Sequence, residues 1–108
     1  MTNLTEREKA FEAKYQHDQE VAFKVNVRRN KLLGLWAADL MGLAKDEAAA
    51  YAKIVVQADF EKRGDRDVLE RVLKDLTSRG VDMSEHRVRK EMDRLLEVAK
   101  AEIMKETS

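Results

Sequence analysis

Cysteine and proline are both absent from this 108-residue chain, and glycine occurs only four times. Without cysteine the chain has no disulfide, no thiolate ligand and no thiol nucleophile, which fits a reducing compartment. Long stretches without proline or glycine, in a sequence that is 39% charged, are typical of helical proteins. The composition therefore predicts an all-α fold, and the length predicts a single core.

The chain also lacks a net charge and a long hydrophobic run. Its 21 basic residues balance 21 acidic ones, whereas nucleic-acid modules usually carry a basic excess for phosphate contacts. The longest apolar stretch, residues 32–43, is too short to span a bilayer and contains Asp39. The polar N-terminus is unlike a signal or transit peptide. We therefore expect a cytoplasmic protein that binds no nucleic acid and is not inserted in the membrane.

The first two predicted helices are bounded by capping patterns and glycine. A capping box at Thr5 and Glu8 opens the first helix, and nothing ends its pattern before Gly42. The second helix is expected to begin at a cap on Asp46 and to end near Glu61.

Two further glycines separate the remaining helices. Asp65 is expected to cap the third helix after Gly64, and Gly80 to end it with left-handed backbone. Asp82 or Ser84 opens the fourth helix, which is the longest of the last three. The fold expected from these boundaries is a four-helix bundle with a long first helix.

Each predicted helix carries an apolar stripe at helical spacing. The residues expected to face the core are Ala22, Val25, Leu32, Leu33, Trp36 and Leu40, then Ala48, Tyr51, Ala52 and Val55, then Val68, Leu69, Val72, Leu73 and Leu76, and finally Val88, Met92, Leu95, Leu96, Ala99 and Ile103. Gly34 interrupts the first stripe at a cost of about 1 kcal/mol relative to alanine. We therefore expect another helix to approach closely beside Trp36.

The first helix is too long for its partners to cover. It would span roughly 55 Å, against roughly 33 Å for the next longest. Residues 1–19 are therefore expected to protrude from a bundle formed by residues 20–108. Leu4, Phe11 and Tyr15 are too few apolar residues to repay the ordering of this segment, so we expect a flexible arm. Their spacing aligns them on one helical face, as in a helix that binds in a partner's groove, although a solvated tail can give the same pattern.

No catalytic, cofactor or metal site is predicted. His17 and Glu20 could form half of a metal site, and His86 lies beside Glu85, but no matched second half is found, so surface histidines explain both better. Four acidic residues surround Gly64, namely Asp59, Glu61, Asp65 and Asp67. They lack the ligand pattern of an EF-hand, and helix capping explains them better.

A basic cluster lies at the entrance to the longest apolar stretch. It consists of Lys24, Arg28, Arg29 and Lys31. A solvated helix face is the usual explanation, but such a cluster could also bind phosphate or an acidic partner. Two alternatives to a protein-interaction role therefore remain: a binding module for nucleotide or nucleic-acid phosphates through this cluster, and a metal-dependent enzyme through His17 and Glu20.

Two blocks of the sequence are specific enough to compare with known families. The first contains Phe11-Glu12-Ala13-Lys14-Tyr15, His17-Asp18, Glu20, Phe23-Lys24 and Arg28-Arg29-Asn30-Lys31-Leu32-Leu33-Gly34-Leu35-Trp36-Ala37-Ala38. The second contains Val55-Val56, Ala58-Asp59-Phe60-Glu61, Gly64-Asp65 and Asp67-Val68. Together they resemble the zeta-type inhibitor subunit of alphaproteobacterial F-type ATP synthases, over residues 4–76.

The resemblance implies a four-helix bundle with a flexible N-terminal inhibitory arm. In that family the arm becomes helical as it wedges between alpha and beta subunits of the catalytic sector, near the gamma shaft, and blocks rotation in the hydrolysis direction. The arm residues carried over are Arg7, Glu8, Phe11, Glu12, Lys14 and Tyr15. Leu4 and Thr5 depart from the family's usual aromatic residue and acid.

The expected function is therefore inhibition without catalysis or cofactor. The candidate partner-binding residues are Leu4, Arg7, Glu8, Phe11, Glu12, Lys14, Tyr15, Arg28 and Arg29. The expected partners are the alpha, beta and gamma subunits of the F-type ATPase. The free protein is expected to be a monomer, and the bound one to lie at the inner membrane through the ATP synthase.

Overall fold

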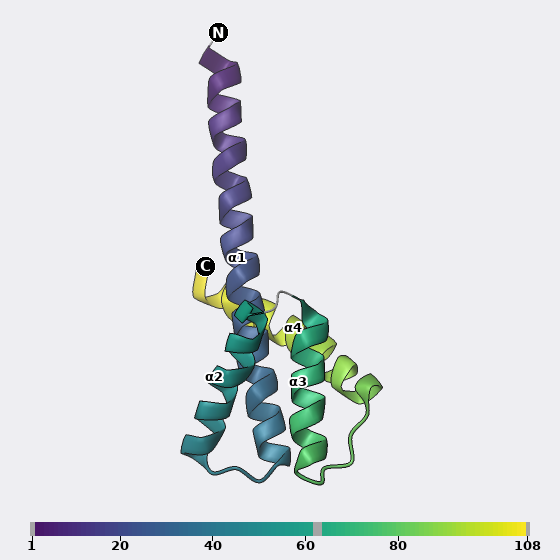
Figure 1. The fold of residues 1–108 in the computed structure, drawn as a ribbon. Coiled ribbons are helices and arrows are strands. Elements are labelled where there is room, and N and C mark those ends of the chain that lie inside the picture. Colours follow the sequence, from purple (N-terminus) through teal and green to yellow (C-terminus); the bar gives the residue numbers. More distant parts are fainter. Residues whose placement is uncertain (1, 62–63, 108) are drawn as a thin grey trace.

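A computed structural model describes the backbone of residues 2–61 and 64–107, and the side chains of residues 18–59 and 64–106. These residues form four helices and no strand: α1 (Thr2–Leu40), α2 (Lys45–Glu61), α3 (Asp65–Ser78) and α4 (Glu85–Thr107) (Figure 1). The predicted all-α fold with a long first helix is confirmed.

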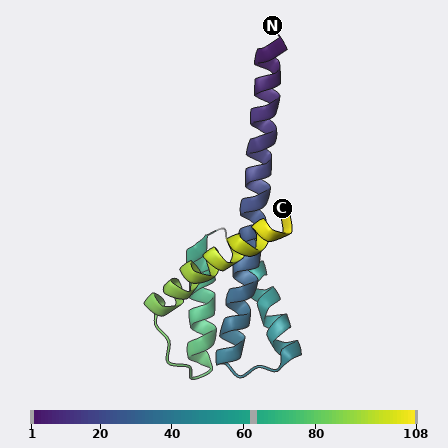
Figure 2. The ribbon, with the colours of Figure 1, turned by 180° about the vertical axis from the view of Figure 1, so that it is seen from behind.

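Helix α1 is the central element and contacts each of the other three helices. Figure 1 shows α2 and α3 alongside its C-terminal half, and Figure 2, seen from behind, shows α4 crossing α1 and α3 diagonally. Within the described part of the chain, α2 and α4 do not contact each other. These two helices therefore cover different sides of α1.

The N-terminal part of α1 extends far beyond the other helices (Figure 1). The 39 residues of α1 give it a length of about 58 Å, and the 23 residues of α4 give that helix about 34 Å. The molecule accordingly measures 66 × 24 × 22 Å. The protruding segment predicted from helix lengths is confirmed as a helical projection.

The core contains the predicted faces of α3 and α4. Their fully or almost fully buried residues are Val68, Leu69, Val72, Leu76, Val88, Met92, Leu95, Ala99 and Ile103. A smaller cluster joins Val25 of α1 to Ala99 and Ile103 of α4. This second cluster fixes the point at which α1 leaves the bundle.

The predicted core face of α1 is partly wrong. Ala22 and Leu40 are exposed, whereas Ala37, Ala38 and the polar Asn30 are buried. Because α2 and α4 pack on different sides of α1, the buried surface of this helix is wider than one apolar stripe. Leu40 lies at the last residue of the helix, where less of the bundle covers it.

Gly34 allows α1 and α2 to approach each other closely. A Cβ atom at this position would lie 2.6 Å from the Cα atom of Ala52 and 3.3 Å from Val55 Cγ2. The distance of 2.6 Å between this Cβ atom and the Ala52 Cα atom is shorter than a van der Waals contact, so only glycine fits here unless the backbone of α2 shifts. The close approach predicted beside Trp36 is confirmed.

Glycine ends α1 and α3 in the same way. Gly42 and Gly80 have φ angles of 72° and 80°, the left-handed region that favours glycine. The amide after each glycine donates to a carbonyl near the helix end, Leu43 to Ala38 and Val81 to Leu76, both at 3.0 Å. These are Schellman motifs, and the predicted role of Gly80 is confirmed.

The predicted helix starts are less accurate. Helix α1 begins at Thr2, so Thr5 lies within it, and α2 begins at Lys45, one residue before the expected cap. Gly64 occupies the cap position of α3, because the Asp65 carboxylate pairs with an arginine of α1 instead. At α4 the prediction is confirmed, since Ser84 Oγ accepts a hydrogen bond from the Arg87 amide at 3.2 Å.

Candidate functional site

The arm emerges from the bundle over one turn of α1. The side chains of residues 18–20 and 22–24 are exposed, and Val21 is the first residue in the described part of α1 that packs against the core. Phe23 is 54% exposed, which places a large aromatic side chain on the surface at the root of the arm. The helical spacing of apolar residues does not predict a role for Phe23, because this residue lies next to Ala22 and outside the predicted apolar stripe of the first helix.

The candidate partner-binding residues of the arm have side chains that lie outside the described residues. They are Leu4, Arg7, Glu8, Phe11, Glu12, Lys14 and Tyr15. The backbone there is helical from Thr2, and the helix is continuous with the bundle. Their role in binding stays a prediction.

Arg28 fastens the end of α4 to the root of the arm. Its Nη1 donates to Glu102 Oε1 at 3.0 Å, and its Nη2 donates to Glu106 Oε1 at 2.6 Å. Hydrogen bonds from a guanidinium to two carboxylates are charge-assisted, and the bond to Glu106 is the main reason that the pKa of Arg28 is raised. Arg28 therefore holds two segments of the bundle together and is already paired.

Arg29 is buried, with 3% of its side chain exposed. Its Nη2 donates to Asp65 Oδ1 at 2.8 Å, and its Nε donates to Asn30 Oδ1 at 3.0 Å. The hydrogen bond from Arg29 is the main cause that lowers the pKa of the Asp65 carboxyl. The expectation of a solvated helix face is thus wrong for Arg29, because α1 and α3 pack together around it.

The four cations of the basic cluster do not gather at one phosphate site. Arg28 and Arg29 pair with carboxylates of α4 and α3, while Lys24 and Lys31 are exposed. Lys31 lines a groove against α2, and Lys24 lines a surface hollow near Glu20. Nothing in this arrangement supports the alternative of phosphate binding through the cluster.

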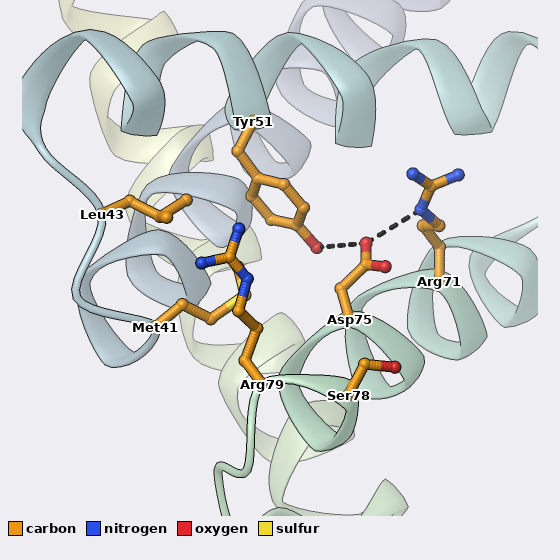
Figure 3. A pocket seen from close by; sticks show the side chains of 7 residues that line it. All are labelled: Met41, Leu43, Tyr51, Arg71, Asp75, Ser78 and Arg79. Carbon is orange, nitrogen blue, oxygen red and sulfur yellow. Dashed lines mark hydrogen bonds and ion pairs between the residues drawn. The ribbon is translucent and has the colours of Figure 1, made fainter.

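A second polar site joins α2 to α3 (Figure 3). Tyr51 points from α2 toward Asp75, its hydroxyl donates to Asp75 Oδ2 at 2.8 Å, and Arg71 Nε donates to the same oxygen at 2.8 Å. The pocket beside this network has a volume of about 260 Å³. Burial raises the pKa of Tyr51 well above its usual range, and the bond to Asp75 adds to this effect. The shared carboxylate of Asp75 therefore links α2 to α3.

No group of three or more histidine, cysteine, aspartate or glutamate side chains that could hold a metal ion is found among the described residues. Glu20 and His86 are exposed. The side chains of His17 and Glu61, which belong to two metal-site hypotheses, lie outside the described residues.

Similarity to known proteins covers most of the chain. The family model described as ATPase inhibitor subunit zeta matches residues 1–102, which include both parts. The chain belongs to the ATPase inhibitor subunit zeta family. A solved structure, determined by NMR in solution, is 49% identical to this zeta-family chain, with a TM-score of 0.68. That similarity covers 78% of this chain and 95% of the other. None of the curated proteins compared with the chain matches it.

Membership of the zeta family gives the chain a general role as an ATPase inhibitor subunit. Within the described part of this zeta-family chain, every helix is too short or too polar to cross a membrane.

Proposed function

We propose that this chain inhibits ATP hydrolysis by an F-type ATP synthase, without catalysing a reaction itself. Residues 1–19 wedge between an alpha and a beta subunit near the gamma shaft, and residues 20–108 hold this arm from outside. One observation carries the proposal: α1 leaves the core at Val21 and continues as a helix to Thr2. Membership of the zeta family supports the inhibitory role.

The mechanism requires binding energy and no reacting group. The arm's ordering cost is offset by burial of Leu4, Phe11 and Tyr15 and by pairing of its charges with the partner. Inhibition follows because the wedge binds one rotary state more tightly than the others and shifts the population toward it.

The bundle's part is to hold the arm at a fixed point. Arg28 joins α1 to the end of α4, and Arg29 joins it to the start of α3. In this proposal these two arginines support the arm from within the bundle instead of contacting the ATPase. The free protein is a monomer in the cytoplasm, and the bound protein is peripheral to the inner membrane.

The test uses an alphaproteobacterial F-type ATPase from which the inhibitor has been removed. The intact chain should reduce hydrolysis, and the chain without residues 1–18 should not. Phe11→Ala combined with Tyr15→Ala should weaken inhibition and leave thermal melting of the bundle unchanged, whereas Lys90→Ala on α4 should change neither. Undiminished hydrolysis in the presence of the intact chain would refute the proposal.

A further inference from the structure

A groove of about 460 Å³ lies between α1 and α2. Its lining includes apolar side chains and two lysines, namely Val27, Leu35, Ala49, Val56, Lys31 and Lys53. Both charged residues that line it are cationic. The groove belongs to the bundle and is separate from the arm.

The groove lies beside the close contact between α1 and α2. Gly34 lets the two backbones approach at Ala52, and Ala52 also lines the groove. Val27, Leu35 and Val56 are half-buried and apolar, although α3 and α4 do not line the groove. Apolar surface gathered in a groove with a charged rim is characteristic of a protein-binding site.

We propose that this α1–α2 groove binds an acidic amphipathic segment of the ATPase catalytic sector. Aliphatic side chains of that segment enter the groove, and its carboxylates pair with Lys31 and Lys53, which are both exposed. The inference rests on the proposed function and names a second contact, through which the bundle is held while the arm occupies its own site.

Charge selects this occupant over a second copy of the chain. A symmetric dimer through the groove would place the same surface of both copies together. The interface would then contain the lysines of both copies and no carboxylate from the groove lining, and like charges within an interface oppose association. The carboxylates of an acidic partner would instead attract Lys31 and Lys53.

The first experiment reverses the charge of the rim. Lys31→Glu with Lys53→Glu should raise the concentration for half-maximal inhibition of the ATPase about tenfold. The matched control is Lys74→Glu with Lys90→Glu, which changes two exposed lysines of α3 and α4 and should leave potency within about twofold. Both variants should melt at the same temperature as the original chain, which would establish that the bundle remains folded.

The second experiment identifies the occupant directly. The chain has no cysteine, so Ala49→Cys provides a single point for a photo-activated cross-linker inside the groove. Ala50→Cys is the control, because Ala50 is also exposed but does not line the groove. We expect the cross-linker on Ala49→Cys, and not the one on Ala50→Cys, to capture a peptide of the catalytic sector that carries Asp or Glu beside aliphatic residues.

The outcomes separate this inference from the proposed function. If the arm is required for inhibition but charge reversal changes potency no more than the control, the groove inference is wrong and the proposed function stands. Cross-links between two copies of the chain, or binding to anionic vesicles that charge reversal abolishes, would also overturn it. If the intact chain neither binds nor inhibits the ATPase, both are wrong.

Discussion

At the scale of single residues, the buried charge of Arg29 makes the bundle depend on one carboxylate. Leaving a buried arginine without its partner is destabilising, but the Asp65 side chain is 56% exposed, so solvent screens the pair. Asp65→Asn should therefore lower the free energy of unfolding near neutral pH by about 1 kcal/mol. The exposed Asp93→Asn on α4 is the control and should have little effect.

The pH dependence of this difference follows from the lowered pKa of Asp65. The folded protein releases the proton of Asp65 more readily than the unfolded chain, so the ion pair stabilises the fold above the unfolded pKa of about 3.9. That stabilisation is lost as the pH falls through the folded pKa. Urea unfolding at several pH values should show the original chain and Asp65→Asn converging in acid. A difference that stays constant to pH 2 would exclude the ion pair as its source.

Gly34 gives a prediction in which two effects have opposite signs. Helix propensity alone favours Gly34→Ala by about 1 kcal/mol. The new Cβ atom would lie 2.6 Å from the backbone of Ala52, which cannot move aside as a side chain tip can. We expect the clash to dominate and to destabilise the bundle by about 1–3 kcal/mol in urea unfolding. A stabilised variant would mean that α1 and α2 are further apart.

These residues also mark what could be predicted from the sequence. Gly34 was informative because a glycine within a helix needs a compensating contact. The burial of Arg29 could not be predicted, because a charged residue within a basic run is usually solvated. Its partner Asp65 lies 36 positions away on another helix. Tyr51 was expected in the core, but its bond to Asp75 depends on how α2 and α3 pack.

At the scale of elements, α1 combines two regions with very different support. Residues 25–40 pack against three helices, whereas residues 2–18 extend beyond them. An isolated helix of that length is marginal in water. Amide hydrogen exchange followed by NMR should therefore be fast in residues 2–18 and slow in residues 25–40. Equal protection in both regions would contradict a flexible arm.

The ends of the helices show which local signals are reliable. Glycine predicts the C-terminal end of a helix well, because few other residues adopt the left-handed backbone that ends it. Acidic residues predict the N-terminal end less well, since a carboxylate such as that of Asp65 can pair with an arginine instead of capping the backbone. The diagonal path of α4 could not be predicted either, because apolar spacing gives the buried face of a helix and not its direction.

At the scale of the whole molecule, the projection dominates the shape. A compact chain of this length has a radius of gyration of about 13 Å, whereas the value here is 17.4 Å. Removal of residues 1–18 should reduce the radius to about 12 Å in small-angle X-ray scattering. Light scattering should give the monomer mass of 12.5 kDa for the intact chain. An intact chain near 13 Å would mean that the arm folds back onto the bundle.

The continuity of α1 has a consequence for rotational register. Since no loop separates arm and bundle, each residue inserted near position 20 would turn the face of Leu4, Phe11 and Tyr15 by about 100° and move it about 1.5 Å along the axis. Seven inserted residues make almost two full turns and nearly restore the angle, at the cost of a shift of about 10 Å. In the proposed complex, where the arm is helical, the angle at which the bundle is mounted would therefore set the rotational register of residues 2–18.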